Sequence, residues 1–104
     1  MTPRALPAIT ERAWMAQVRE LAGLYGWRTY HPWLSVHSQP GWPDLALVKA
    51  PRLILAELKS DKGRLTVHQK EWIEVLGQCD EIEAVVWRPE DLETVNRLLR
   101  RPPR

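Results

Sequence analysis

The chain has 104 residues, with 15 Lys or Arg, 13 Asp or Glu and a formal net charge of +2. This length fits one domain, and we expect a single domain over 1–104 with an ordered core over about 9–100. Its one cysteine, Cys79, excludes an internal disulfide and a zinc site built from several cysteines. The chain shows no secretory signal and no run of roughly 18 apolar residues, so we expect a cytoplasmic protein without membrane contact.

The first predicted helix begins after Thr10, which can cap it, and ends at Gly26. Its apolar positions recur at helical spacing: Trp14, Val18, Leu21 and Tyr25. The segment "WRTYHPW" then predicts a short strand at an edge or a strand end, because Pro32 cannot donate to a ladder of hydrogen bonds. We expect "LSVHSQPGWP" to form a loop.

Two continuous apolar runs follow, "DLALV" over 44–48 and "LILAEL" over 53–58. Joined by the four residues 49–52, they predict an antiparallel hairpin whose strands are covered on both faces. After the basic turn "SDKGR", Thr66 can cap a second helix. Its inward side chains would be Leu65, Trp72, Ile73 and Leu76.

A fourth strand is predicted at "EAVVW", and Pro89 can begin a final helix. The inward positions of that helix would be Leu92, Val95 and Leu99. The predicted order is therefore helix, three strands, helix, strand, helix.

Each run of the hairpin carries a carboxylate among apolar neighbours. With a symmetric loop Val48 lies opposite Leu53, and counting outward places Asp44 opposite Glu57. Directly paired residues have Cβ atoms about 5 Å apart, and two unit charges about 4 Å apart repel by roughly 4 kcal/mol at an effective dielectric constant of about 20. The pair needs a shared proton, a basic partner or a divalent cation, and oxygen ligands alone favour Mg²⁺ or Mn²⁺.

Three further polar residues each allow two interpretations. Lys59 projects from the same strand face as Glu57 and could take part in chemistry or only neutralise that acid. Glu11 precedes Trp14 by three positions and should face the sheet, but an acid in the first turn also favours the helix dipole. Gln69 lies on the inward face of its helix, yet "TVHQ" also fits a capping box.

Together these residues resemble the PD-(D/E)xK nuclease superfamily. The run "GWPDLALVKAPRLILAELKSDKGRLTVHQKEW" is similar to its VRR-NUC branch, particularly the small stand-alone phage and bacterial members. Pro43 and Asp44 match the PD element, and Glu57, Leu58 and Lys59 match the ExK element. The resemblance implies an α/β fold with a restriction-endonuclease-like core, αβββαβ plus a C-terminal helix, in which helices flank a mixed central sheet.

The resemblance implies a DNA endonuclease that uses Mg²⁺ or Mn²⁺ to hydrolyse phosphodiester bonds. Asp44, Glu57 and the Leu58 carbonyl would bind the metal. Glu11 would support the site as the acid of the first helix. Glu20 is a competing carboxylate in that helix, but it falls off the apolar stripe.

The remaining catalytic roles would fall to Lys59 and Gln69. Lys59 would orient the attacking water and offset charge in the transition state, and Gln69 would brace the lysine or the metal site. His37 could enter the site from the loop before the PD element, but a lone loop histidine is usually only exposed. The histidines His31, His37 and His68 stay outside the catalytic set.

Basic residues near the proposed site could contact DNA phosphates: Lys62, Arg64, Arg52, His68 and Lys70. Such contacts position DNA without reading its sequence. We therefore expect structure-selective cleavage of Holliday junctions or other branched DNA in a bacterial or phage-infected host cell, without a nucleotide cofactor. A homodimer would supply two sites for symmetric cuts. The alternatives are a monomeric nicking or flap-type nuclease and a non-catalytic DNA-binding or phage-assembly module.

Overall fold

The computed structural model describes residues 8–32 and 39–102. The elements in chain order are helix α1 (Glu11–Leu24), strands β1 (Arg28–Tyr30), β2 (Leu45–Lys49) and β3 (Arg52–Leu58), helix α2 (Val67–Gly77), strand β4 (Glu83–Trp87), a 3₁₀ turn (Pro89–Asp91) and helix α3 (Leu92–Arg100). The predicted order of helices and strands is thus confirmed, and the protein is a small α/β protein. None of the helices in these two ranges combines the length and apolarity needed to cross a membrane.

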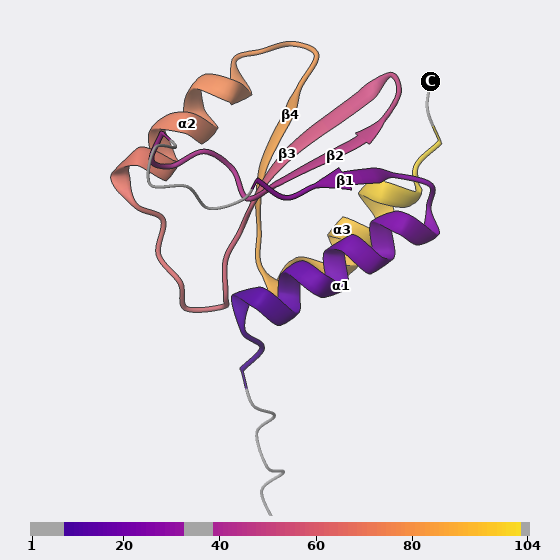
Figure 1. The fold of residues 1–104 in the computed structure, drawn as a ribbon, viewed down its shortest axis with the longest axis horizontal. Coiled ribbons are helices and arrows are strands. Elements are labelled where there is room, and N and C mark those ends of the chain that lie inside the picture. Colours follow the sequence, from indigo (N-terminus) through magenta and orange to yellow (C-terminus); the bar gives the residue numbers. More distant parts are fainter. Residues whose placement is uncertain (1–7, 33–38, 103–104) are drawn as a thin grey trace, which may run out of the picture.

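The four strands form one mixed sheet in the order β1-β2-β3-β4. The pairs β1–β2 and β2–β3 are antiparallel, whereas β3 and β4 are parallel. Helices α1 and α3 lie together on one side of the sheet, and α2 lies on the other side (Figure 1). Because β3 and β4 are parallel, their C-terminal ends lie at the same end of the sheet, where Leu58 pairs with Trp87.

The main core lies between the sheet and the α1–α3 pair. Trp14 on α1 is fully buried, and its indole Nε1 donates to the carbonyl of Trp87 at 3.0 Å. Since α1 begins at Glu11, one turn before Trp14, this bond fixes the start of the helix near the ends of β3 and β4. The other buried residues of this cluster are Val18, Ala22, Trp27, Leu45, Leu47, Ile54, Ala56, Leu58, Trp87, Val95 and Leu99.

The register of the β2–β3 hairpin is the predicted one, with Val48 opposite Leu53. The loop is shorter than expected, because Lys49 also pairs with Arg52 and only Ala50 and Pro51 lie between the strands. Shortening a symmetric loop by one residue on each side leaves the pairing unchanged. Residue 44, directly before β2, therefore remains level with residue 57, as the count from the sequence required.

Two expectations about burial are wrong. Strand β2 is not covered on both faces: Leu47 is buried, but Val48 is 42% exposed, because α2 contacts β4 rather than reaching across to this half of the sheet. Leu92 was expected to point inward and is 45% exposed. It occupies the first position of α3, directly after the 3₁₀ turn, and the helix reaches the core only at Val95 and Leu99.

Candidate active site beside the end of strand β3

Asp44 is held in place by one contact with β3 and one with the residue that follows β1. Its Oδ2 accepts a hydrogen bond from the backbone N–H of Leu58 at 2.9 Å. Its backbone carbonyl lies 2.8 Å from Nδ1 of His31, which follows β1. The carboxylate is therefore fixed against β3 at the position that the hairpin register predicts.

The segment before Asp44 is anchored on helix α2. The indole Nε1 of Trp72 donates to the carbonyl of Pro40 at 3.0 Å, and the rings of Trp42 and Trp72 meet edge to face with centroids 4.9 Å apart. Gly41 adopts a φ of +91°, and a Cβ at this position would lie 2.4 Å from the carbonyl carbon of His68. The close approach of these two backbones requires glycine, and it ties the segment before Asp44 to the start of α2.

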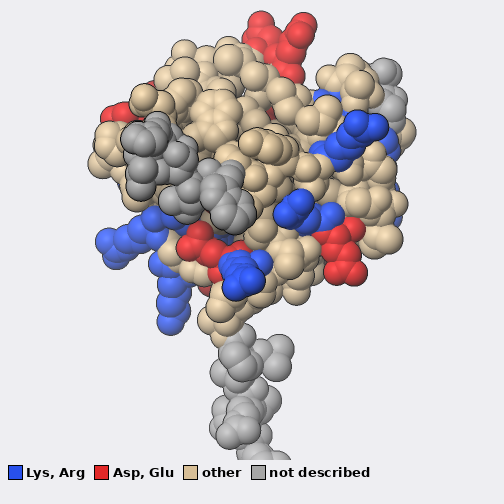
Figure 2. All heavy atoms as spheres, viewed as in Figure 1, with Lys and Arg blue, Asp and Glu red and all other residues tan. Residues whose placement is uncertain are grey.

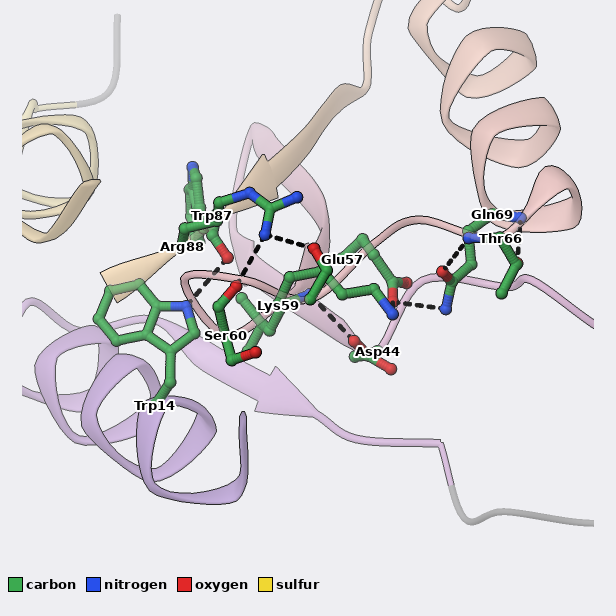
Figure 3. A network of polar contacts seen from close by, with 11 residues as sticks. Trp14, Asp44, Glu57, Lys59, Ser60, Thr66, Gln69, Trp87 and Arg88 are labelled. Carbon is green, nitrogen blue, oxygen red and sulfur yellow. Dashed lines mark hydrogen bonds and ion pairs between the residues drawn. The ribbon is translucent and has the colours of Figure 1, made fainter. Parts of the chain in front are cut away.

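Glu57 is the most deeply buried charged residue of the described chain, with 1% of its surface exposed. Its Oε1 accepts from the Gln69 amide Nε2 at 2.9 Å and lies 3.9 Å from Nζ of Lys59 (Figure 3). Its Oε2 is buried and accepts no hydrogen bond from the described residues. A buried oxygen of this kind is costly unless a proton or a cation satisfies it.

The surroundings of Glu57 favour its protonated form. Burial raises the pKa of this carboxyl from 4.5 to about 8, the hydrogen bonding and negative charge of Asp44 add to the rise, and Glu11 contributes further repulsion. Lys59 acts in the opposite direction and lowers the pKa. The acidic pair thus holds a proton near neutral pH when no cation is bound.

Gln69 both caps α2 and contacts Glu57. Its side-chain Oε1 accepts from the backbone N–H of Thr66 at 2.8 Å, and its own N–H donates to the Thr66 hydroxyl at 3.1 Å, which completes the capping box of α2. The other end of the same amide donates to Glu57. Capping therefore presents the amide nitrogen to the acid.

Glu11 lies at the first position of α1 with its side chain exposed, and it lines a cavity of about 220 Å³. Asp44 and Leu58 line the same cavity, together with Arg12, Met15 and His31. The structure thus brings Glu11 close to Asp44, as expected. Glu20, the competing acid, is exposed further along α1.

Sequence reasoning missed two polar residues of this cavity. Arg12 places a cation beside the acids, and its only signal in the sequence is its position after Glu11. His31 was set aside as an exposed histidine, and it is exposed, yet it contacts the backbone of Asp44. Since Tyr30 pairs with Ala46, His31 lies opposite Leu45, one position from Asp44.

The donor atoms at this site suit a hard cation only in part. Within residues 8–32 and 39–102, no three His, Cys, Asp or Glu side chains form a ready group for a metal ion. What the structure provides is an acidic pair, a buried carboxylate oxygen that accepts no hydrogen bond from any described residue, and a third acid at the rim of the adjoining cavity. Oxygen donors in this combination fit Mg²⁺ or Mn²⁺ better than softer metals.

Four of the five proposed DNA contacts are exposed near this edge of the sheet: Lys62, Arg64, His68 and Lys70. Figure 2 shows basic side chains projecting at the lower left of the molecule, where the segment between β3 and α2 runs in Figure 1, with acidic side chains beside them. His68 lies 3.8 Å from Glu71, and both side chains are well exposed. His37 lies outside the described residues.

Arg52 is not brought to the site. It lies beside the hairpin loop, at the opposite end of β3, where its guanidinium forms two bonds of 2.8 and 2.9 Å with the Glu83 carboxylate. It also donates to the carbonyl of Leu98 and stacks over the ring of Trp27. These contacts give Arg52 a structural role, and we remove it from the proposed DNA contacts.

Comparisons of the chain with protein-family models, with curated proteins and with solved structures found no match. The functional conclusion therefore depends on the residues and their geometry.

Proposed function

We propose that this protein is a divalent-metal-dependent endonuclease that hydrolyses phosphodiester bonds in DNA. The observation that carries the proposal is the buried Glu57 carboxylate, level with Asp44 and beside Lys59, with one oxygen that accepts no hydrogen bond from the part of the chain that the structure describes. A core of this size gains no stability from two adjacent acids, so a functional role explains the pair better than a structural one.

The order of elements supports a more specific assignment within this proposal. The αβββαβ order, the mixed sheet and the PD and ExK elements at the expected strand positions fit a restriction-endonuclease-like core of the VRR-NUC type. Pro43 is buried next to Asp44, and Leu58 points into the main core between Glu57 and Lys59. The apolar members of both elements thus anchor the strands, while the polar members face the site.

In this proposal the acids bind the metal ion. Asp44, Glu57 and the Leu58 carbonyl would hold Mg²⁺ or Mn²⁺, with Glu11 supporting the site from the cavity rim. When bound, the cation would activate the phosphodiester as an electrophile and neutralise charge that develops on it.

The other side chains of the site orient and balance charge. The Gln69 amide donates to Oε1 of Glu57, which leaves Oε2 as the oxygen available to bind a cation. The ammonium group of Lys59 lies 3.9 Å from that carboxylate and would offset negative charge on the reacting phosphate. Lys59 is only 8% exposed, so its charge acts where water screens it little.

The substrate class follows from where the remaining cations lie. Lys62, Arg64 and Lys70 are exposed beside the site and suit contacts to the phosphate backbone, which fix position but carry no sequence information. We therefore propose selectivity for DNA structure, with Holliday junctions or other branched DNA as substrates. A homodimer would supply the two sites for paired cuts.

The decisive experiment is a cleavage assay with labelled four-way junction, flap, single-stranded and linear duplex DNA. We expect cleavage of branched DNA with Mg²⁺ or Mn²⁺ and no cleavage with a chelator. Asp44→Asn and Glu57→Gln should lower the rate to background, and Lys59→Met should lower it by at least about a hundredfold. Retention of cleavage in both acid variants would show that the proposed site is wrong.

A matched pair of acids on α1 controls for changes in net charge. Glu11→Gln should reduce cleavage, whereas Glu20→Gln, which removes the same charge away from the cavity, should not. If the protein binds DNA but cuts none of the four substrates, the non-catalytic DNA-binding alternative replaces the proposal. Single cuts by a monomer would favour the nicking or flap-type nuclease.

A further inference from the structure

The ends of the two parallel strands place Arg88 beside the proposed site. Lys59 follows β3 and Arg88 follows β4, and the backbone N–H of Lys59 donates to the carbonyl of Trp87 at 3.1 Å. Arg88 thus begins its side chain level with the lysine of the ExK element. Its backbone N–H is fixed by Oδ2 of Asp91 at 2.9 Å, so the direction of the side chain is set by the 3₁₀ turn that follows.

The guanidinium of Arg88 spans the turn that follows Lys59. Its Nη1 donates to the carbonyl of Ser60 at 2.7 Å and to the carbonyl of Gly63 at 2.6 Å (Figure 3). The N–H of Gly63 also donates to the Ser60 carbonyl at 3.1 Å, which closes the turn. One half-buried cation therefore bonds both ends of a four-residue turn from outside it.

This turn carries basic residues and touches Lys59. Lys62 lies within it and Arg64 follows directly, both exposed. A Cβ on Gly63 would lie 3.4 Å from Cδ of Lys59 and 3.0 Å from Oγ of Ser60, so the turn packs closely on the lysine stem. Movement of the turn would shift the exposed cations relative to the acids. We call this turn together with Arg64, residues 60–64, the basic turn.

We propose that Arg88 is a positioning residue that holds the basic turn, and with it Lys62 and Arg64, in the orientation that contacts DNA phosphates. This inference rests on the proposed function. Nη1 of the guanidinium is engaged by two backbone carbonyls, so the role assigned to Arg88 is to hold the turn and not to bind phosphate. Its contribution is to order the turn before DNA binds, which removes an entropic cost from binding.

The first test measures the turn without any DNA. Hydrogen exchange of the Lys62 and Gly63 amides, and trypsin cleavage after Lys62 and Arg64, are followed in wild type, Arg88→Met and Arg88→Lys. Arg88→Met keeps the unbranched stem but donates no hydrogen bond, so both rates should rise about tenfold or more. Arg88→Lys should fall between the two, because an ammonium group has a shorter reach and no fork.

Arg52→Met is the matched control. Arg52 also donates to a backbone carbonyl at 2.8 Å, but at the far end of β3, so its loss should reduce global stability without loosening the basic turn selectively. A rise in exchange and cleavage at the basic turn that is equal in Arg52→Met and Arg88→Met would reduce the role of Arg88 to general stability.

The second test measures binding of uncleaved junction DNA in chelator over a range of salt. We expect the dissociation constant of Arg88→Met to rise about tenfold, and its salt dependence, the slope of log K against log salt, to weaken by up to about 2 as two phosphate contacts are lost. In a Lys62→Ala/Arg64→Ala background, Arg88→Met should add little further loss, because its effect passes through those two residues. Fully additive losses would overturn the inference.

The two tests separate this inference from the proposed function. If wild type binds no DNA, the proposed function fails, and the part of the inference that concerns DNA fails with it. If wild type binds DNA and Arg88→Met binds it equally well while the turn loosens, only the inference fails.

Discussion

The amide Nε2 of Gln69 donates a hydrogen bond of 2.9 Å to Oε1 of Glu57, while the amide Oε1 of Gln69 accepts a hydrogen bond of 2.8 Å from the backbone N–H of Thr66. The first turn of α2 is thus bonded both to its cap and to the carboxylate on β3. Because the capping box fixes the amide at one end, its other end is aimed at Glu57. The orientation of the buried acid therefore depends on how α2 begins.

This double role of Gln69 can be separated by two substitutions. Gln69→Ala and Thr66→Ala both break the capping box and should each lower the free energy of unfolding by about 1 kcal/mol. Only Gln69→Ala removes the bond to Glu57, so only that variant should lose about 10- to 100-fold in cleavage rate. Denaturant unfolding and single-turnover cleavage measure the two effects. An equal loss of rate in both variants would mean that Gln69 acts only through the helix cap.

The raised pKa of Glu57 predicts how the metal-free protein responds to pH. This pKa lies at about 8 in the folded protein against 4.5 for an ordinary carboxyl, mainly because of burial and next because of Asp44. Between these values the folded state binds more protons than the unfolded state, so the free energy of unfolding falls as pH rises from about 5 to about 8, by an amount on the order of a few kcal/mol. Denaturant unfolding at several pH values in chelator measures this fall.

The control for this pH dependence is Glu57→Gln, which keeps the shape of the side chain but cannot ionise. Its free energy of unfolding should change much less between pH 5 and pH 8 than that of wild type, after the common contribution of other groups is subtracted. A wild-type slope identical to that of the variant would show that Glu57 is ionised throughout this range.

Local sequence signals account for most of the fold. Thr10 and Thr66 cap the two helices that they were expected to cap, and the β2–β3 register follows from counting outward from the loop. The predicted loop length was wrong, but the predicted register was still correct, because the loop is shorter by one residue on each side. Exposure was harder to predict: Val48 and Leu92 are apolar and correctly assigned to their elements, but how far a helix covers the sheet depends on packing between distant elements.

The same distinction holds for the candidate site. Asp44, Glu57 and Lys59 are found from strand pairing and alternation, which are local geometry. His31 and Arg88 come from the ends of other strands, and a single sequence gives no signal that these ends meet. Arg52 shows the opposite error, since its charge suggested a DNA contact although its partners are internal.

Gly41 offers a test of how the segment before Asp44 is held. Its φ of +91° is unfavourable for any residue with a Cβ, and that atom would lie 2.4 Å from the backbone carbon of His68. Gly41→Ala should therefore lower the free energy of unfolding by about 1–3 kcal/mol. It should also lower the cleavage rate by more than this loss of stability explains, because Asp44 shifts with its segment. Thermal unfolding and cleavage at a temperature where the variant stays folded measure both effects.

Gly23→Ala is the matched control for that variant, since a Cβ at Gly23 meets nothing within 4 Å inside helix α1. It should be neutral or stabilising by up to about 1 kcal/mol and should not change cleavage. If Gly41→Ala retained wild-type cleavage once folded, the contact between this segment and α2 would not be what positions Asp44.

Divalent cations should displace the proton that Glu57 holds. At pH 7 the pKa of about 8 keeps this carboxyl largely protonated in the metal-free protein, and a cation that binds the carboxylate must release that proton. Titration calorimetry with Mg²⁺ or Mn²⁺ in two buffers of different ionisation enthalpy should show release of close to one proton per ion bound. At a hundred times its dissociation constant the ion should stabilise the fold by about 2.7 kcal/mol. Asp44→Asn and Glu57→Gln should weaken both effects, and binding that persists in these variants, or binding by wild type without proton release, would place the ion elsewhere on the protein.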